Sequence, residues 1–436
     1  MYHIRALDTG KKHIFPISYQ SVICVGIGKY SQNVLIHILA SYFLGLLDII
    51  FDLELKHHRR GLPGRTIQTT IEMMQQSEEQ SIRAMRSRLL AWFEENQRPL
   101  PWRQSYHPYQ VWIAEIMGQQ TQMERVAEYF SRWMQLFPDV ASLAHAPEQA
   151  VLKAWEGLGY YSRAHNIRRT AQILLEHHSG CIPEEQQALL ALPGIGPYTA
   201  AAILSIGFNQ PCPLVDANVE RVFARLHDLE EPVKGTIGKK TVQQLAALFL
   251  DRDAPRAFNQ ALMELGALVC TPKNPNCSSC PLQHDCLASS RGTVALRPVL
   301  SKRPGRIDII MACGIIKHNG LLYIQQRLAD DIWGGLWEFP GGRLEGDETP
   351  AQAVLREILE ETGWRVRVGQ SYHTVIHYYT RYRVTLHSFF CNLEKGQSLE
   401  PSLNAASHYA WVDAAAMLQY PFPSGHRQLV AALNEK

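Results

Sequence analysis

Residues 192–200 read LPGIGPYTA, and an apolar stretch with helical character follows them. Gly194 and Gly196 stand in a tight turn that exposes successive backbone N–H groups at a helix N-terminus, an arrangement that binds anions such as phosphate. Pro197 suits the first helical turn, where its missing N–H costs no intrahelical bond. Glycine-rich turns between helices are also common without a ligand. The stretch therefore predicts two helices joined by a tight turn and leaves its function open.

A second helix start follows shortly afterwards. Residues 215–222 read VDANVERV, with Asp216 placed to cap the N-terminus of the helix that begins there. A capping carboxylate can also take part in chemistry, so both readings of Asp216 are compatible.

Helical periodicity extends outward from this centre, with apolar residues at three- and four-residue spacing from Ser81 onward. Residues 288–306 contain Gly, Pro and five Arg or Lys residues, which is typical of a linker. Beyond it the pattern changes to strands near 307–316 and 321–326, a Gly-rich turn, a helix near 351–362 and aromatic strands through Cys391. The sequence therefore predicts an all-α domain at 81–287, a basic linker at 288–306 and a smaller α/β domain at 307–436.

The first 80 residues are the least informative part. Residues 34–51 are strongly apolar, but His37 and Asp48 interrupt them, which argues against a membrane span. Residues 56–80 are polar and predict turns. We interpret residues 1–80 as an appended or mis-started extension without a catalytic role.

Composition excludes several classes of protein. The chain has 436 residues, of which 46% are apolar and 19% charged, so disorder, collagen and a coiled coil are excluded as the main structure. The net charge of +2 divides into +1 for residues 1–80, +4 for 81–306 and −3 for 307–436. The chain is therefore not a general polybasic binder, and contact with nucleic acid would require local patches and backbone amides.

Four of the nine cysteines are clustered, at Cys270, Cys277, Cys280 and Cys286. No secretory signal opens the chain, and the spacing is unlike a disulfide framework. The cluster predicts a metal site in a reducing compartment. From the chemistry alone, a zinc knuckle and an iron–sulfur centre are equally compatible.

A single carboxylate stands out in residues 111–126, which read VWIAEIMGQQTQMERV. Glu115 lies among apolar residues on an expected helix, where burial would raise the pKa of its carboxyl and suit it to act as a general acid. A surface glutamate is the equally compatible alternative from this stretch alone.

Acidic residues are clustered on the helix expected in the C-terminal domain. Glu357, Glu360 and Glu361 share one face there, while Val354, Leu355, Ile358 and Leu359 are expected to supply apolar contacts. Such carboxylates suit Mg²⁺ bound to a pyrophosphate. A merely solvated acidic face is the alternative.

Taken together, these stretches resemble known families. LPWR (100–103), EIMGQQTQ (115–122), WEGLGYYSRA (155–164) and FNQALMELGALVC (258–270) resemble the MutY adenine DNA glycosylases over about residues 85–290. The cysteine spacing resembles the [4Fe–4S] loop of endonuclease III and MutY. Residues 342–364 resemble a complete Nudix box, and residues 336–350 and 420–430 resemble the MutT nucleotide pyrophosphatases.

The glycosylase resemblance implies a helix–hairpin–helix fold and a set of roles. Glu115 would protonate the departing adenine and Asp216 would stabilise the oxocarbenium-like sugar, with help from Tyr198 and Asn218. The remaining DNA- or substrate-binding residues implied are Trp102, Arg103, Gln120, Gly194, Gly196, Gln260 and His377. Among these, Gln120 would be the wedge between bases, and Trp102 and Arg103 would line the base pocket.

Tyr198 excludes one activity, and two other positions depart from the MutY pattern. Tyr198 stands where the strand-cleaving endonuclease III relatives carry a Schiff-base lysine, so efficient lyase activity is not expected. Gly118 replaces an expected Leu before the paired glutamines. His165 replaces an expected Arg, which removes one phosphate contact.

The Nudix resemblance implies an α/β/α sandwich with Mg²⁺ and 8-oxo-dGTP as the first nucleotide to test. The residues implied are Gly341, Glu348, Arg356, Glu357, Glu360 and Glu361. The loop with which MutY reads 8-oxoguanine, Phe-Ser-His, is replaced here by Val375-Ile376-His377, in which only the His is retained. His426 stands where MutT would carry its base-reading Asn.

We therefore expect removal of adenine from double-stranded DNA, opposite 8-oxoguanine or guanine, after the base is flipped out of the stack. We further expect a [4Fe–4S] cluster, a monomer and a bacterial cytoplasmic location without a membrane anchor. The alternatives are an endonuclease III-like glycosylase–lyase and a DNA-binding scaffold that carries a nucleotide hydrolase.

Overall fold

A computed structural model describes residues 65–300 and 305–435 of the chain. Two units are distinguished, Met1–Gln80 and Ser81–Lys436, and the second contains all of the sites discussed below. The expectation that residues 1–80 are an extension without a catalytic role falls mainly on residues 1–64, which lie outside the described residues. The apolar stretch at 34–51 lies there too. Among the helices of the described part, none is long and apolar enough to cross a membrane.

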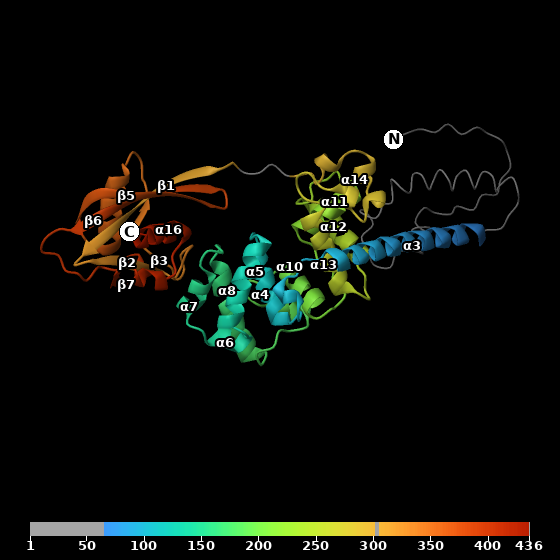
Figure 1. The fold of residues 1–436 in the computed structure, drawn as a ribbon, viewed down its shortest axis with the longest axis horizontal. Coiled ribbons are helices and arrows are strands. Elements are labelled where there is room, and N and C mark those ends of the chain that lie inside the picture. Colours follow the sequence, from blue (N-terminus) through green and yellow to red (C-terminus); the bar gives the residue numbers. More distant parts are fainter. Residues whose placement is uncertain (1–64, 301–304, 436) are drawn as a thin grey trace, which may run out of the picture. The chain divides into compact units, whose positions relative to one another are not determined.

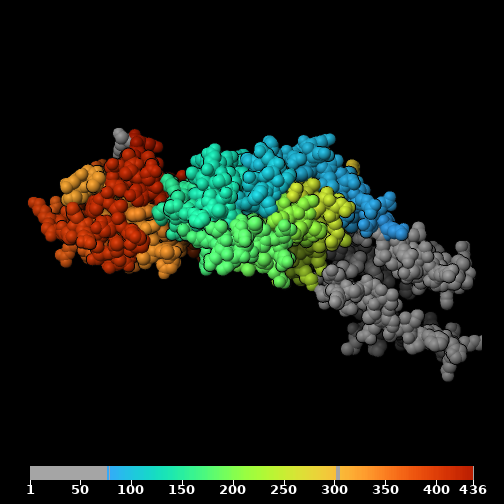
Figure 2. Space-filling model, turned by 90° about the horizontal axis from the view of Figure 1, so that it is seen from below, coloured from blue at the N-terminus to red at the C-terminus, as the bar shows by residue number. Residues whose placement is uncertain are grey.

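The first described element is helix α3 (Arg65–Asn96), and it starts earlier than the sequence suggested. Residues 65–80 were expected to form turns, but they are helical because no Gly or Pro occurs between Arg65 and Asn96. Ile82, Leu89 and Phe93 are buried at helical spacing. The Arg86 guanidinium donates to the Phe249 carbonyl at 2.8 Å, which fixes α3 against α12 (Thr236–Phe249). Figure 2 shows the blue surface of α3 beside the green and yellow surface that includes α12.

The all-α part follows, and Figure 1 shows it in blue to yellow. Its main core is built by large aromatic residues such as Trp112, Trp133 and Trp155, all fully buried. The further elements are η1 (Pro101–Arg103), α4 (Pro108–Gly118), α5 (Met123–Leu136), α6 (Val140–His145), α7 (Glu148–Trp155), α8 (Ser162–His177), α9 (Gln186–Leu190), α10 (Pro197–Ala202), η2 (Ile203–Gly207), α11 (Ala217–Leu226), α13 (Pro255–Leu268), η3 (Cys277–Ser279), η4 (Gln283–Asp285), α14 (Leu287–Ser290) and η5 (Val294–Leu296).

The expected linker at 288–306 is bound to the helical domain over its first part. The buried carboxylate of Asp228 pairs with Arg291 at 3.1 Å and Arg297 at 2.9 Å, and it accepts a hydrogen bond from Thr293 at 2.6 Å. A buried carboxylate needs such partners, and the basic residues of this segment supply them. Their positive charge therefore serves the fold, which the composition of a linker does not reveal.

The C-terminal part forms one seven-stranded mixed sheet, in which β1 pairs with β6 in parallel and the other pairs are antiparallel. The path through the sheet is β3-β2-β1-β6-β5, with β4 on β1 and β7 on β2. The strands and helices are β1 (Ile307–His318), β2 (Leu321–Arg327), β3 (Trp337–Glu338), β4 (Gly341–Arg343), α15 (Pro350–Thr362), β5 (Val366–Tyr379), β6 (Tyr382–Leu393), β7 (Ala406–Val412), η6 (Ala416–Gln419) and α16 (Ser424–Asn434).

Strand β1 sends alternate side chains to two separate cores. Ala312 and Ile316 pack with residues of α15, whereas Cys313 and Ile315 pack with residues of α16. A Cβ at Gly314 would lie 2.5 Å from an atom of Ile358, so glycine is what allows α15 to approach the sheet. Helices on both faces make an α/β/α sandwich. The predicted order, an all-α domain followed by this sandwich, is confirmed.

One part of the helix prediction was wrong. Val354 and Ile358 of α15 are fully buried, but Leu355 is 42% exposed and Leu359 45% exposed. Each leucine is one position, about 100° of helix, beyond a buried neighbour, and the buried stripe is completed instead by Ala353 and Thr362.

Candidate active site and metal centre

Helix α4 carries Glu115 three residues before its end at Gly118. The residues on either side of Glu115, Ala114 and Ile116, are buried, and the Glu115 side chain itself is only partly accessible. Burial raises the pKa of the Glu115 carboxyl to about 7, although the Tyr198 hydrogen bond and the Arg103 charge act in the opposite direction. The carboxyl therefore exists in both protonation states near neutral pH, as a general acid requires.

Tyr198, in the first turn of α10, meets Glu115 directly. Its hydroxyl donates to Glu115 Oε2 at 2.5 Å. Burial and the neighbouring carboxylates raise the pKa of Tyr198 well above its ordinary value, so the phenol remains a donor. The sequence placed these two residues 83 positions apart and the fold joins them.

Asp216 completes this group from α11, where it caps the helix as predicted. Its carboxylate accepts hydrogen bonds from Val219 N and Asn218 Nδ2, both at 2.7 Å. Burial raises the pKa of Asp216, while these two donors favour its charged form. Its charge in turn raises the pKa of Glu115, so the two carboxyls interact. A proton donor and a hydrogen-bonded carboxylate thus lie together, a pairing suited to cleaving a glycosidic bond.

The turn before α10 has the predicted form. Gly194 has a φ of +75°, and a Cβ there would lie 2.7 Å from the Cβ of Asn166, so only glycine fits. Gly196 precedes Pro197, which begins α10 in its first turn. Phosphate binding by this turn stays a prediction.

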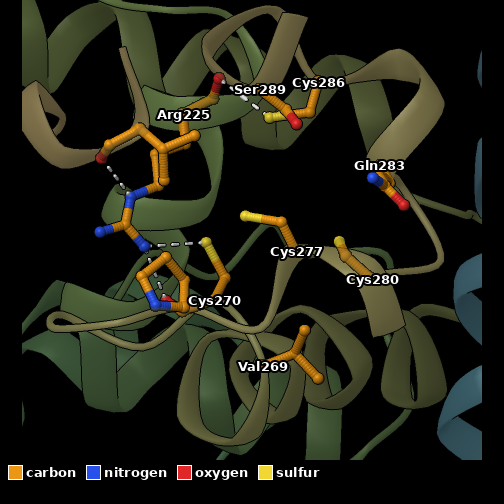
Figure 3. A pocket seen from close by; sticks show the side chains of 10 residues that line it. Arg225, Val269, Cys270, Cys277, Cys280, Gln283, Cys286 and Ser289 are labelled. Carbon is orange, nitrogen blue, oxygen red and sulfur yellow. Dashed lines mark hydrogen bonds between the residues drawn. The ribbon is translucent and has the colours of Figure 1, made fainter. Parts of the chain in front are cut away.

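The four clustered cysteines line one space of about 320 Å³, and Figure 3 shows their side chains around it. Burial raises the pKa of Cys280 to about 11 and also raises that of Cys286. Buried thiols of this kind become thiolates on binding a positive metal centre. Arg225 Nη1 lies 3.3 Å from the Cys270 sulfur and adds a charged donor. The donor set and the space fit an iron–sulfur cluster.

A buried arginine links this loop to the carboxylate of α11. Arg221 donates to the Cys270 carbonyl at 2.7 Å, the Asn218 Oδ1 at 2.8 Å and the Gly266 carbonyl at 2.7 Å. Asn218 in turn donates to Asp216. The sequence gave no sign of this role, because Arg221 falls on an ordinary helical position.

In the C-terminal sandwich, Arg356 gathers three of the predicted carboxylates. It pairs with Glu348 at 2.7 Å, Glu357 at 3.0 Å and Glu360 at 3.1 Å. The hydrogen bond from Arg356 lowers the pKa of Glu348 to about 2. Arg356 of α15 therefore relieves the mutual repulsion of Glu357 and Glu360 on its own helix and also binds Glu348, which precedes the helix.

Glu361 faces inward instead. It accepts hydrogen bonds from Gly341 N and Gln325 Nε2, both at 3.0 Å. Burial and the nearby Glu338 raise the pKa of Glu361 to about 8. Glu338 is itself buried and paired with Arg327 at 2.5 Å. Among the residues that the structure describes, no group of three or more His, Cys, Asp or Glu side chains is arranged to hold a single metal ion, so binding of Mg²⁺ by these carboxylates stays a prediction.

Comparison with known proteins matches three parts of the chain. Residues 113–247 match the HhH-GPD superfamily of base excision DNA repair proteins, 270–286 the iron-sulfur binding domain of endonuclease III, and 311–432 the NUDIX domain. The adenine DNA glycosylase of Mus musculus is 33% identical over 371 residues, which cover 72% of each chain. That of Rattus norvegicus is 31% identical over 76% of this chain and 74% of its own. That of Buchnera aphidicola subsp. Baizongia pistaciae is 33% identical over 58% and 72%.

The chain belongs to the adenine DNA glycosylase family. It is a base excision repair enzyme with a helix–hairpin–helix domain, an iron-sulfur binding domain and a Nudix domain. The iron–sulfur reading of the cysteines is thereby confirmed over the zinc knuckle. The individual roles of the site residues remain predictions.

The glycosylase holds its expected base-pocket residues in unexpected ways. Trp102 is 5% exposed and packs edge-on against Phe130 in the core. Arg103 donates to Gln260 Oε1 at 2.9 Å and to Glu264 Oε2 at 3.0 Å. Both partners are buried, and the hydrogen bonds from Arg98 and Arg103 lower the pKa of Glu264 to about 2 despite its burial. Arg103 and Gln260 thus form part of a buried ion-pair network behind Glu115, a role that the LPWR motif did not reveal.

Gln120, the expected wedge residue of the glycosylase, is exposed just beyond the end of α4, with a φ of +60°. Its side-chain oxygen accepts a hydrogen bond of 2.6 Å from the Tyr160 hydroxyl. Arg163 lies beneath this pair and donates to carbonyls of both segments. Arg163 belongs to WEGLGYYSRA, one of the stretches that resemble MutY, but the resemblance implies no role for it.

A hollow of about 780 Å³ lies within the unit Ser81–Lys436, lined by aromatic and histidine side chains that include Tyr160, Trp333, His377 and Tyr379. Burial lowers the pKa of His377, whose Nδ1 is buried without a hydrogen-bond partner among the described residues. Burial also lowers the pKa of His426 to about 3, and its Nδ1 accepts from Phe339 N at 3.2 Å. Both rings are therefore neutral at physiological pH.

The two residues before His377, which replace the Phe and Ser of the reader loop, have apolar side chains. Val375 is buried in the sheet and Ile376 is 47% exposed, so neither offers a hydrogen bond from its side chain. Of the three residues in that segment, His377 alone brings a polar side chain to the hollow.

Proposed function

We propose that this glycosylase removes adenine that is paired with 8-oxoguanine or guanine, and that Glu115 is its general acid. The contact that carries the proposal is the 2.5 Å hydrogen bond between Tyr198 and Glu115, beside the partly buried Asp216. A carboxyl with a pKa of about 7 gives up a proton to a departing base at neutral pH.

Asp216 acts after the bond to the base begins to break. The sugar then develops positive charge, which a fixed carboxylate stabilises without having to reorganise. Asn218 and Val219 hold the carboxylate at 2.7 Å each, so its orientation is set before the substrate arrives. Tyr198 cannot form the Schiff base of a lyase, so the product is an intact strand with an abasic site.

The adenine reaches Glu115 only when it is turned out of the duplex. Gln120 is exposed at the end of α4 and would enter the stack in place of the adenine. The glycine turn at 194–196 offers backbone N–H groups to a phosphate. Unstacking costs a few kcal/mol, and such contacts offset that cost.

Recognition of the opposite base is assigned to the hollow lined by Tyr160, His377 and Tyr379. Aromatic rings stack on a base, and His377 adds an imidazole, whose pKa burial lowers, to the lining of the hollow. Residues 375–377 contain no serine, so we expect the enzyme to discriminate only modestly between 8-oxoguanine and guanine.

A second activity is proposed for the Nudix domain: hydrolysis of a nucleoside triphosphate, 8-oxo-dGTP first, to the monophosphate. Glu357, Glu360, Glu361 and the Gly341 carbonyl would hold Mg²⁺, which neutralises the pyrophosphate and activates water. Support comes from the partly buried Glu361, which accepts hydrogen bonds from Gly341 N and Gln325, and from Arg356, which pairs with both Glu357 and Glu360.

One assay separates the alternatives. A duplex with an A·8-oxoguanine pair is incubated with the full chain and then treated with hot alkali. Cleavage at adenine only after alkali supports the proposal, whereas cleavage without alkali indicates a lyase and no cleavage indicates a scaffold. Asp216→Asn serves as the control and should bind the duplex without releasing adenine. Retention of more than about a tenth of the wild-type rate would overturn the role of Asp216.

The nucleotide activity is measured separately on the full chain, with Mg²⁺ or Mn²⁺ and both oxidised and normal dNTPs. Hydrolysis that is lost in Glu357→Gln supports the second activity. Absence of hydrolysis of every dNTP means that the Nudix domain only recognises DNA.

A further inference from the structure

Arg163 is a buried cation that is bound almost entirely by main-chain oxygens. It lies in the first turns of α8 and is 9% exposed. Its guanidinium donates to five carbonyls, those of Ile116 (2.7 Å), Met117 (3.4 Å), Gln119 (2.8 Å), Leu158 (2.9 Å) and Gly159 (3.1 Å). All five bonds come from Nη1 and Nη2, while Nε is buried without a hydrogen-bond partner among the described residues. Burying a guanidinium is costly, so its retention here, with both terminal nitrogens bound to carbonyls of two segments, indicates a specific task.

The first three carbonyls belong to the end of α4, the helix that carries Glu115. Carbonyls in the last turn of a helix have no intrahelical partner, and their dipoles favour a positive charge. Arg163 therefore acts as the C-terminal cap of this helix, in place of the glycine cap or water found at most helix ends. Although burial lowers its pKa to about 10, the guanidinium is charged at neutral pH.

The other two carbonyls belong to the segment 157–160, which faces the end of α4. Both segments hold left-handed backbone: φ is +60° at Gln120 and +49° at Tyr160. For a residue with a side chain this conformation costs about 1–2 kcal/mol and persists only where neighbours impose it. Arg163 bridges the two segments below these residues, and the Tyr160–Gln120 hydrogen bond of 2.6 Å joins them above.

We propose that Arg163 is a positioning residue for extrusion of the adenine: it locks the end of α4 to segment 157–160, so that Gln120 is presented to the duplex in one fixed conformation. This inference rests on the wedge role proposed above for Gln120. Arg163 itself touches neither DNA nor the reacting atoms. A wedge that is ordered before binding loses less conformational entropy on insertion.

A lysine cannot replace this arginine. The guanidinium is a flat fork with five donors, whereas an ammonium has three donors at a single point and cannot reach both segments. Arg163→Lys keeps the charge and most of the volume, and it isolates the bridging geometry. Arg168→Lys is the matched control, because Arg168 lies on the same helix and donates to one carbonyl, Ala146, at 2.9 Å.

The experiment uses a duplex with an A·8-oxoguanine pair and 2-aminopurine beside the adenine. Stopped-flow fluorescence follows unstacking with a 2′-fluoro-adenosine that resists hydrolysis, and quench flow follows single-turnover release from normal adenosine. For Arg163→Lys we expect both rates to fall about 10-fold or more, as loss of charged hydrogen bonds implies. The affinity of Arg163→Lys for an undamaged duplex, which reports phosphate contacts, should stay within about 2-fold of wild type. Both rates of the control variant Arg168→Lys should also stay within about 2-fold of wild type.

A double-mutant cycle separates positioning from general destabilisation. If Arg163 acts through Gln120, the variant Gln120→Ala/Arg163→Lys should be no slower than the slower single variant, within about 2-fold, because the wedge is already lost. Multiplied effects, or an Arg163→Lys extrusion rate within about 3-fold of wild type, would overturn the proposal. If Arg163→Lys does not fold, Tyr160→Phe tests the same lock from the surface, and a wild-type extrusion rate in that variant overturns it.

The outcomes also distinguish the role of Arg163 from the wedge role of Gln120 and from adenine release itself. A wild-type extrusion rate in Gln120→Ala refutes the wedge and with it this role of Arg163. An impaired Gln120→Ala beside a normal Arg163→Lys refutes only the role of Arg163. Failure of the wild-type protein to release adenine refutes the proposed function itself.

Discussion

Replacing Glu115 by glutamine should make the glycosylase more stable at alkaline pH while abolishing adenine release. Burial raises the pKa of the Glu115 carboxyl from 4.5 to about 7. The folded state therefore binds this proton more tightly than the unfolded state. As the pH rises from about 4.5 to 7, the free energy of unfolding of the wild type falls, and above that window the loss is complete. A glutamine has no proton to lose and escapes this penalty.

The size of the effect follows from the shift. The difference between 4.5 and about 7 corresponds to an upper limit of about 3 kcal/mol. Because the side chain of Glu115 is partly accessible to solvent, we expect about 1–3 kcal/mol at pH 8. The glutamine oxygen can still accept the Tyr198 hydrogen bond. For a domain of this size, each kcal/mol raises the unfolding midpoint by about 2–4 °C.

The assay is thermal unfolding, followed by near-ultraviolet circular dichroism between pH 5 and pH 8, with iron and sulfide content checked. The midpoint of Glu115→Gln should approach that of the wild type at pH 5 and exceed it at pH 8. Glu128→Gln, whose side chain is 68% exposed, controls for removal of one surface charge. A Glu115→Gln variant that is equally or less stable at pH 8, or that shows the same offset at both pH values, refutes the reasoning.

Four further outcomes follow from the geometry. Single-turnover adenine release should decline above about pH 7 as Glu115 loses its proton; a flat profile to pH 9 would contradict the acid role. Glu264→Gln leaves the Arg103 charge without its carboxylate, so the decline of adenine release should begin at lower pH. The free energy of unfolding should also fall by about 3–5 kcal/mol. An unchanged pH profile of adenine release would show that Arg103 does not act on Glu115. Cys280→Ser should lose the brown absorbance of the cluster and bind DNA more weakly, whereas a colourless wild type with one bound zinc would contradict the cluster assignment. Glu357→Gln should abolish Mg²⁺-dependent dNTP hydrolysis without changing adenine release, and loss of both activities would point to a folding defect instead.

Local chemistry made several features predictable from the sequence. The Gly194–Pro197 turn and the cap at Asp216 each depend on neighbours within a few positions of the chain. The two-layer alternation of β1 also follows from its side-chain period of two.

Features that depend on distant partners were not predictable. Arg103 forms a buried ion pair with Glu264, which lies 161 positions away in the chain, and no local sequence pattern indicates this pair. Arg163 has an ordinary helical context, and its role depends on carbonyls of α4 that no residue type encodes. The early start of α3 was missed for a different reason, because a polar stretch without Gly or Pro is compatible with either a helix or a loop.

The bridge formed by Arg221 bears on how the enzyme matures. One end of this arginine holds the carbonyl of Cys270, and the other holds the amide that orients Asp216. A newly made chain whose cysteines have not yet received iron and sulfide would lack the fixed loop on which that orientation depends. We therefore expect the apoprotein to be slow at breaking the glycosidic bond even where it still binds DNA. Insertion of the cluster would then be required before the enzyme becomes active, so that only fully assembled molecules remove adenine.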